Sequence, residues 1–354
     1  MIRVLVCDDS AFMRRAIRQM LESDAEIEVV GVARDGQEGL RYAKELQPDV
    51  ITMDIEMPSM DGLTALRFIM REAPTQVLML SSLTTEGSVS SLQALKLGAA
   101  DVLAKDASQF SANITKIKDE LLTRVKGLGR SRSRRAATAK SPAANAANPA
   151  PPAALPRFRR GQFDVVCVAS STGGPPVLET LIGSLPPGFD TPIVIAQHMP
   201  ELFTRSMAAR LNDMCPQTVH HAADGMPIER RGVYIAPGGS HTQIVKQSLA
   251  RNALKVGPEP LDAIYKPSAN ALFASAAQAT ASRTLAIVLT GIGDDGLLGA
   301  RDLHAKGGVI LAQSEPTCVV YGMPKAVAQA SLTTACLAPA ELARALAGLA
   351  AAAA

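Results

Sequence analysis

Short apolar runs alternate with longer amphipathic stretches along most of this chain. Each run of four or five residues is rich in Val, Ile and Leu, ends in a polar or small residue, and is followed by a stretch with helical spacing. A buried strand followed by a helix is the repeating unit of a parallel sheet. The pattern occupies residues 1–125 and returns over 161–347, so it predicts two α/β domains with doubly wound parallel sheets.

Residues 126–160 interrupt the alternation. From Gly127 to Arg160 the chain is rich in Ala, Pro, Ser and Arg. Prolines at 149, 151 and 152 would break any helix there. This composition predicts a flexible, partly extended linker between the two domains. Five of the seven residues 348–354 are Ala, which predicts a low-complexity tail that frays towards its end.

In the first domain, four apolar runs end in charged or hydroxyl side chains. The carboxyl ends of neighbouring parallel strands meet at one edge of a sheet. Three carboxylates brought together there would repel one another unless a cation lay among them, and a set of oxygen ligands suits Mg²⁺. A hydroxyl and an ammonium at the same edge would bind a phosphoryl group. The carboxylates are Asp8, Asp9 and Asp54, the hydroxyl is Ser81 and the ammonium is Lys105.

Each of these residues also has a purely local interpretation. Asp8-Asp9-Ser10 can cap the helix predicted over Ala11–Leu21, and Asp54 can begin a turn with Met57-Pro58. The full set on four strands in this order, however, resembles the response-regulator receiver domain. The strings that match most densely are Asp54-Ile55-Glu56-Met57-Pro58 and Met60-Asp61-Gly62.

The receiver resemblance covers roughly residues 1–125. It implies a (βα)5 fold, Asp54 as the phosphoacceptor, and Mg²⁺ held by the three carboxylates and the backbone carbonyl of Glu56. Two positions depart from the family pattern. Asp106 stands where the family usually has Pro, and Val102 where many receivers have an aromatic residue. We therefore expect weaker or differently arranged coupling from Asp54 to the distant face.

In the second domain, three buried runs end in a hydroxyl, an imidazole and a carboxylate. Ser171 follows the first run and leads through a Gly-Gly-Pro turn into a predicted helix, His198 follows the second run, and the pair Asp294-Asp295 follows the third. These three groups are the set needed for nucleophilic acyl transfer. The histidine takes the proton of the serine, and the carboxylate orients the histidine and stabilises its charged form.

The same residues could also have ordinary structural roles. A Ser before Gly-Gly can cap a helix or bind a phosphate, a His can end a strand, and Gly-Asp-Asp-Gly can be a turn. Alternation along the strand favours Ser171 over Ser170 as the side chain aimed at the crevice. The pattern does not decide between Asp294 and Asp295, because Asp294 could cap the helix that begins near Gly296.

Charge, cysteine usage and hydropathy limit the classes of function. The net charge is +3, from 36 basic and 33 acidic residues. Ten Lys or Arg and no acidic residue lie between Leu121 and Phe163, so the rest of the chain, with 26 basic residues, has a net charge of −7. A basic linker permits nucleic-acid binding, but the chain has no Trp, 3% aromatic residues and no helix-turn-helix pattern, so we expect no nucleic-acid partner. Five scattered cysteines and the absence of a signal peptide or a long apolar run predict a cytoplasmic protein that does not insert into membranes.

Six strings of the second domain, in order and spacing, resemble the catalytic domain of the CheB family of protein-glutamate methylesterases. The resemblance implies Ser171 as nucleophile, His198 as general base and then acid, and Asp295 as the orienting carboxylate. We expect the oxyanion hole to consist of the backbone N–H groups of Thr172 and Ile292, since both lie on turns at this edge. Family members often have Met where Ile292 stands. The strings are Ser170–Gly174, Gln197–Pro200, Ile235–His241, Lys266–Ser268, Thr290–Gly296 and Tyr321–Pro324.

Together the two resemblances imply a phosphorylation-activated serine hydrolase with a Rossmann-like catalytic domain. It would hydrolyse glutamate methyl esters, and deamidate certain glutamines, on methyl-accepting chemotaxis receptors. Its partners would be those receptors and a CheA-type histidine kinase, its catalytic domain would need no cofactor, and the chain would be a monomer. The alternatives are a nucleotide-binding module, against which no GxGxxG follows the first strand, and a DNA-binding response regulator acting through the basic linker.

Overall fold

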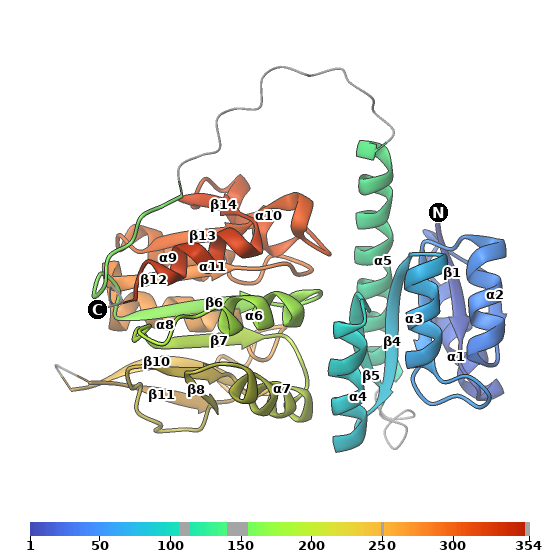
Figure 1. Cartoon of the computed structure of the whole chain (residues 1–354), viewed down its shortest axis with the longest axis horizontal. Coiled ribbons are helices and arrows are strands. Elements are labelled where there is room, and N and C mark those ends of the chain that lie inside the picture. Colours follow the sequence, from blue (N-terminus) through green and yellow to red (C-terminus); the bar gives the residue numbers. More distant parts are fainter. Residues whose placement is uncertain (106–113, 140–154, 249–250, 351–354) are drawn as a thin grey trace. The chain divides into compact units, whose positions relative to one another are not determined.

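The computed structural model of this protein describes residues 1–105, 114–139, 155–248 and 251–350. The chain divides into two compact units, Met1–Ala150 and Pro151–Ala354. Each unit is an α/β fold built on a parallel sheet with helices on its faces (Figure 1). The α/β class and the parallel sheets predicted from the pattern are thereby confirmed. The expected linker core at 140–154, the departure at Asp106 and the tail residues 351–354 lie outside the described residues.

The first unit has a five-stranded sheet in the order β2-β1-β3-β4-β5, with all neighbouring strands parallel. Its central strands are almost wholly apolar and buried, as expected for a sheet covered on both faces. The strands are β1 Ile2–Cys7, β2 Ile27–Ala33, β3 Val50–Asp54, β4 Gln76–Ser82 and β5 Asp101–Lys105, and the helices are α1 Ala11–Glu22, α2 Gly36–Leu46, α3 Gly62–Glu72, α4 Thr85–Lys96 and α5 Ile114–Ala139.

The helices α1 to α4 begin at small polar residues that cap them. Ser10, Asp35, Asp61 and Thr84 each accept a hydrogen bond from a backbone N–H in the first turn. The hydroxyl of Ser10 therefore caps α1. The neighbouring Asp8 carboxylate accepts the backbone N–H of Ser10 at 2.9 Å, just before the helix begins.

Helix α5 corrects the expectation of a flexible linker from residue 126. The helix continues to Ala139, and its contacts with the rest of the unit explain why. Leu128 is fully buried, and a Cβ on Gly129 would lie 2.5 Å from Ile2 Cγ2. Arg130 forms an ion pair with Glu26 at 2.7 Å. These contacts stabilise helical structure in a segment whose composition alone favoured a linker.

The second unit has a seven-stranded parallel sheet in the order β14-β13-β12-β6-β7-β9-β8 and a separate antiparallel hairpin, β10-β11. The order reverses direction at β6, the first strand, as in doubly wound folds. The strands are β6 Val165–Ser170, β7 Ile193–Gln197, β8 Thr218–His221, β9 Gly232–Ile235, β10 His241–Ser248, β11 Arg251–Gly257, β12 Thr284–Val288, β13 Val309–Gln313 and β14 Ala335–Leu337, and the helices are α6 Gly174–Gly183, α7 Glu201–Met214, α8 Ala269–Ala279, α9 Leu297–Ala305, α10 Met323–Gln329 and α11 Pro339–Ala347.

Strands β12, β6 and β7 lie side by side in the middle of this sheet, and every residue of all three is buried. Because the strands are parallel and adjacent, the segments that follow them meet at one edge. Burial raises the pKa of the Cys167 thiol in β6, which therefore behaves as a small apolar side chain. The packed unit also continues past the expected boundary at 347, since Leu349 is fully buried.

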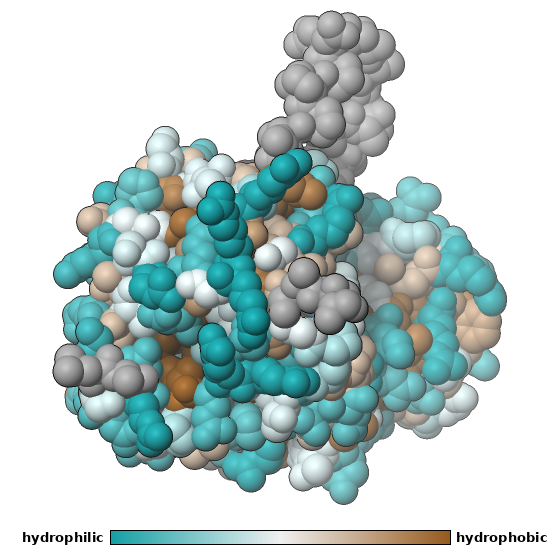
Figure 2. Space-filling model, turned by 60° about the vertical axis from the view of Figure 1, so that its left-hand side comes forward, coloured by the Kyte–Doolittle hydropathy of each residue, from teal (hydrophilic) through white to brown (hydrophobic). Residues whose placement is uncertain are grey.

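The face of the protein in Figure 2 is largely hydrophilic, with apolar side chains exposed in small patches. The most exposed large apolar side chains of the second unit include Ile264, which is 89% exposed, and Leu261. Among the described residues, no helix combines the length and the apolar character that crossing a bilayer requires.

The extension of α5 can be tested at Leu128. We expect Leu128→Ala to lower the unfolding free energy of the first unit by about 2–5 kcal/mol, because it leaves a cavity under a packed helix. Arg130→Ala is the matched control on the exposed side of the helix and should cost no more than about 1 kcal/mol. Denaturant unfolding of the full chain measures both. If Leu128→Ala left the unfolding free energy of the first unit unchanged, the helix would not pack against the unit at this position.

Candidate active site

Ser171 directly follows β6 and lies against the loop that follows β12. Its N–H donates to the carbonyl of Thr290 at 3.1 Å, and a Cβ on Gly291 would lie only 2.7 Å from Ser171 Cβ. Carbon atoms do not approach so closely, so only glycine at 291 lets this loop pass next to Ser171. Gly173, with φ of 78°, makes the left-handed turn from which α6 begins. Ser171 thus stands between a helix start and the 290–296 loop.

The two serines at the end of β6 have different surroundings. The Ser170 hydroxyl is buried and has no hydrogen-bond partner among the described residues. Ser171 is 8% exposed and follows the end of the strand. This difference agrees with the alternation that favoured Ser171 as the residue facing the crevice.

His198 follows β7 and is paired with Asp295, which follows β12. His198 Nε2 lies 2.8 Å from Asp295 Oδ2, and both side chains are buried. The backbone N–H of His198 donates to the carbonyl of Ser170 at 3.0 Å, which fixes its place beside the serine segment. The other ring nitrogen, Nδ1, is buried without a hydrogen-bond partner in the part of the chain that the structure describes.

Asp295 receives several hydrogen bonds besides that of His198. The start of helix α8 supplies three of them: Ser268 Oγ at 3.0 Å, the N–H of Ala269 at 2.7 Å and the N–H of Asn270 at 3.0 Å. Burial by itself would raise the pKa of Asp295, but the hydrogen bond and charge of His198 and the N–H groups of α8 outweigh it and hold that pKa below its usual value. The buried carboxylate is therefore kept ionised.

The remaining predicted residues of this site lie where the sequence pattern expected them. Thr172 is in the turn before α6, and Ile292 follows Gly291 in the loop beside Ser171. Asp294, the alternative to Asp295, is exposed, and it is not the cap of α9, because the N-cap position belongs to Gly296.

Sequence reasoning missed the residues that surround the imidazole and the carboxylate. The ring of Tyr265 stacks on that of His198, with centroids 4.4 Å apart and planes 5° from parallel. His241, which is fully buried, accepts the N–H of Ser268 at Nδ1 over 3.1 Å. His241 and Ser268 both lie inside strings that resemble the CheB family, but nothing in the spacing of those strings indicated these contacts.

The first unit brings its three carboxylates together at the strand ends. Oxygen atoms of Asp8, Asp9 and Asp54 lie within 4.8 Å of one another. Lys105 Nζ lies 2.6 Å from Asp54 and 3.4 Å from Asp8, so one ammonium faces two buried carboxylates. Burial raises the pKa of Asp54 to about 6, although Lys105 opposes the rise. A further cation would lower this electrostatic cost, and an all-oxygen donor set suits Mg²⁺.

Of the three other residues that the receiver resemblance singled out, Glu56 bonds to the acidic cluster, whereas Ser81 and Val102 have other neighbours. The N–H of Glu56 donates to Asp54 at 3.4 Å, which ties its loop to the acidic cluster. The hydroxyl of Ser81 is buried and donates to the carbonyl of Gly87 at 3.0 Å in the first turn of α4. Val102 is buried in β5, where its short side chain cannot reach as far as an aromatic ring.

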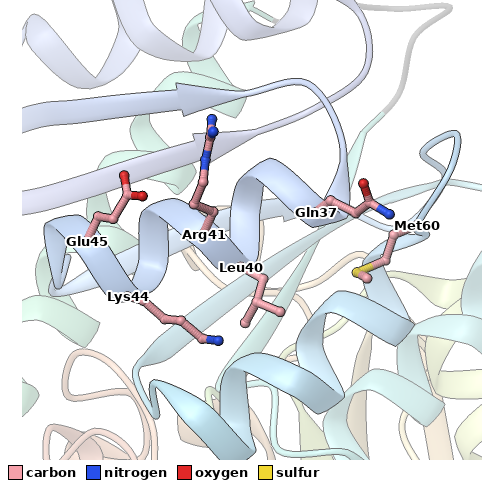
Figure 3. A pocket seen from close by; sticks show the side chains of 6 residues that line it. All are labelled: Gln37, Leu40, Arg41, Lys44, Glu45 and Met60. Atoms are coloured by element: carbon pink, nitrogen blue, oxygen red, sulfur yellow. The ribbon is translucent and has the colours of Figure 1, made fainter.

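An open hollow of about 320 Å³ lies elsewhere on the first unit (Figure 3). Side chains of helix α2 and Met60 line it, with both signs of charge and none of the predicted site residues. The lining residues are Gln37, Leu40, Arg41, Lys44, Glu45 and Met60.

The hydrogen bonds to Asp295 lead to a stability prediction. At pH 7, Asp295→Asn should lower the unfolding free energy of the second unit by about 1–3 kcal/mol, because an amide N–H would face backbone donors. The folded-state pKa of Asp295 is lowered, so its contribution is present above the unfolded value of about 4 and is lost as the pH falls through the folded value. The difference between the two proteins should therefore shrink below about pH 4.

Denaturant unfolding across a pH series measures this difference. Asp294→Asn changes the same chemistry at the exposed neighbour and should alter stability little. Equal stabilities of the parent protein and Asp295→Asn at pH 7 would contradict the role of the hydrogen-bond network.

Each of the two units matches a known protein family. The family model described as CheB methylesterase matches residues 166–346, and the response regulator receiver domain matches residues 4–115. A protein-glutamate methylesterase/protein-glutamine glutaminase of Oleidesulfovibrio alaskensis is 47% identical over 350 residues, covering 94% of this chain and 95% of that protein. One from Nitratidesulfovibrio vulgaris is 45% identical over 348 residues, covering 94% and 95%.

A solved structure supports the same relationship for the second unit. The crystal structure of the Thermotoga maritima CheB methylesterase catalytic domain is similar with a TM-score of 0.51 and 36% identity, covering 53% of this chain and 98% of that one. The domain matches, the near full-length relatives and this structure agree, and the chain belongs to the CheB methylesterase family, with an amino-terminal response-regulator receiver domain.

Proposed function

We propose that this chain is a protein-glutamate methylesterase and protein-glutamine glutaminase whose second unit carries out the hydrolysis and whose first unit regulates it. The observation that carries the proposal is the buried pair of His198 and Asp295 at 2.8 Å, beside Ser171 at the carboxyl edge of adjacent strands. Family membership gives the same reaction class. The relatives of known name act on protein glutamate and glutamine side chains.

In the proposed reaction, Ser171 Oγ attacks the carbonyl carbon of a glutamate methyl ester while His198 Nδ1 accepts the hydroxyl proton. The tetrahedral intermediate collapses, the bond to the methoxy oxygen breaks, and the histidine returns the proton so that methanol leaves. Water then attacks the acyl-enzyme with His198 again as the base, and glutamate and free Ser171 result. A glutamine substrate follows the same path with ammonia as the leaving group.

His198 Nδ1 has no hydrogen-bond partner among the described residues, which supports this assignment of the two ring nitrogens. Asp295 is bonded to Nε2, so the opposite nitrogen is the one available to the serine. The carboxylate stabilises the imidazolium that forms when the proton arrives. Three donors from the start of α8 keep the carboxylate ionised, and this leaves the transferred proton on the histidine.

We assign the oxyanion hole to the backbone N–H groups of Thr172 and Ile292. The close approach of Gly291 to Ser171 supports this assignment, because it brings the loop that contains Ile292 against the nucleophile. Backbone donors fixed before the reaction stabilise the negative charge that develops on the carbonyl oxygen. Ile instead of Met at position 292 leaves such a donor unchanged.

In the first unit, we propose Asp54 as the phosphoacceptor, with Asp8, Asp9, Asp54 and the carbonyl of Glu56 holding Mg²⁺. When bound, the metal neutralises part of the charge of the carboxylates and the phosphoryl group. Lys105 already contacts Asp54 and would pair with a phosphoryl oxygen. Ser81 would exchange its bond to Gly87 for a phosphoryl oxygen, which couples phosphorylation to the start of α4.

We propose methyl-accepting chemotaxis receptors as the substrates and a CheA-type histidine kinase as the phosphoryl donor. Protein glutamyl esters and glutamines are the substrates that the names of the relatives give, and a receiver domain is the usual acceptor of phosphate from such a kinase. The receiver would then report the state of the kinase to the hydrolase.

Substitution of each of the two adjacent serines tests which one is the nucleophile. Ser171→Ala should abolish methanol release from methylated receptor, with a loss of several orders of magnitude, because it removes the hydroxyl on which the acyl-enzyme forms. Ser170→Ala should lose far less, because that hydroxyl faces the interior. Methanol release and labelling by a fluorophosphonate probe measure both variants. More than a few per cent of activity in Ser171→Ala would rule out Ser171 as the nucleophile.

The regulatory assignment is tested with acetyl phosphate. In the presence of Mg²⁺, the full chain should become phosphorylated and its rate of methanol release should rise, whereas Asp54→Asn should show neither change. Chelation of the metal should stop phosphorylation without lowering the basal rate. Phosphate incorporation that persists in Asp54→Asn would place the acceptor elsewhere.

A further inference from the structure

We propose that Tyr265 is a positioning residue that holds the imidazole of His198 in the orientation needed for proton transfer. The inference rests on the proposed function, in which His198 Nδ1 serves Ser171. Its basis is the stack of the two rings, with centroids 4.4 Å apart and planes 5° from parallel. No feature of the sequence pattern pointed to this tyrosine.

A histidine side chain has two torsions, so one hydrogen bond does not fix its ring. Asp295 holds the ring at Nε2, the atom farthest from the backbone. Rotation that keeps this atom near the carboxylate would still swing Nδ1 and tilt the ring plane. A parallel ring in contact with one face opposes such tilting, and the Tyr265 stack thus supplies the restraint that Asp295 lacks.

The segment around Tyr265 is itself firmly held. The carbonyl of Lys266 accepts the N–H of Gly239 at 3.2 Å, and the N–H of Ser268 donates to His241 Nδ1 at 3.1 Å. Ser268 Oγ in turn donates to Asp295. The same short segment therefore bonds the carboxylate at one end and stacks on the imidazole at the other.

The 290–296 loop lies on the hydroxyl side of Tyr265. A Cβ on Gly293 would lie 3.2 Å from the phenolic oxygen, so glycine at 293 leaves the ring its space. A second histidine–tyrosine stack in this unit, His220 on Tyr234, is looser, with centroids 5.3 Å apart and planes 20° from parallel. Tyr234 is a fully buried core residue, whereas Tyr265 is only partly buried. Replacing Tyr265 therefore removes a contact to the site and leaves the core intact.

The test compares Tyr265→Phe, Tyr265→Leu and Tyr265→Ala in the full chain, with Ile264→Ala as the matched control. Ile264 is the neighbouring residue and is 89% exposed. The first measurement is the rate of Ser171 labelling by a small fluorophosphonate, which depends on activation of the serine but not on docking of a protein substrate. The second is the separation of kcat and KM with methylated receptor, and thermal unfolding checks the fold.

We expect Ser171 of Tyr265→Ala to be labelled about 10- to 100-fold more slowly than in the parent protein. The kcat should fall while KM stays nearly unchanged, because small displacements of a catalytic group slow the reaction strongly. Tyr265→Leu should be similarly slow, because it keeps apolar volume without a flat ring. Tyr265→Phe keeps the stack and should label within about twofold of the parent. Ile264→Ala should label at the parent rate.

Two results would overturn the proposal. Labelling of folded Tyr265→Ala or Tyr265→Leu at the parent rate would show that the ring does not position His198. A Tyr265→Phe variant as slow as Tyr265→Ala would show that the hydroxyl, and not the stack, is what matters. Failure of the proposed function is distinguishable from either, because the parent chain would then not be labelled at Ser171 at all.

Discussion

The buried negative charge of Asp295 is the constraint on which the catalytic edge depends. An ionised carboxylate out of water is costly unless it is paired and hydrogen-bonded. The chain meets this requirement by directing the start of α8 at it, with Ser268 and two backbone N–H groups, and by pairing it with His198. The hydrogen bonds that stabilise the charge also fix the position of α8, the loop after β12 and the end of β7. Stability and catalytic geometry therefore have the same origin here.

Close packing of the backbone brings these segments together. Gly291 carries no side chain where the loop after β12 crosses Ser171, and Gly173 has the positive φ from which α6 starts. A side chain at 291 would force the loop away from Ser171, and one at 173 would clash with Val319 and strain the left-handed backbone. The receiver unit has the same electrostatic problem at its own strand ends, where Asp8 and Asp54 are buried. There the countercharge is the ammonium of Lys105.

In both units the local sequence pattern predicts the ends of the strands but not the contacts between distant segments. Strand ends follow from the alternation of apolar runs and polar residues, so Ser171, His198 and Asp54 could be predicted from the pattern. The choice of Asp295 over Asp294 came from the resemblance to the CheB family. Tyr265 could not be predicted, because its loop has no periodicity and its partner lies 67 positions earlier in the chain. The end of helix α5, from residue 126, was wrongly predicted to be a linker for a related reason. Its composition is that of a linker, but the helix packs against β1 and α1, and Leu128 is buried.

By itself, the sequence determined the α/β class, the two sheets and the residues that end their strands, because burial of apolar runs and helix signals are local properties of the chain. The resemblance of its strings to two families added the chemistry expected at those ends. Only the tertiary structure decided which nitrogen of His198 meets Asp295, which groups surround that carboxylate, and that an aromatic ring covers the imidazole. These are contacts between segments distant in sequence, and their geometry exists only once the sheet has brought the strand ends together.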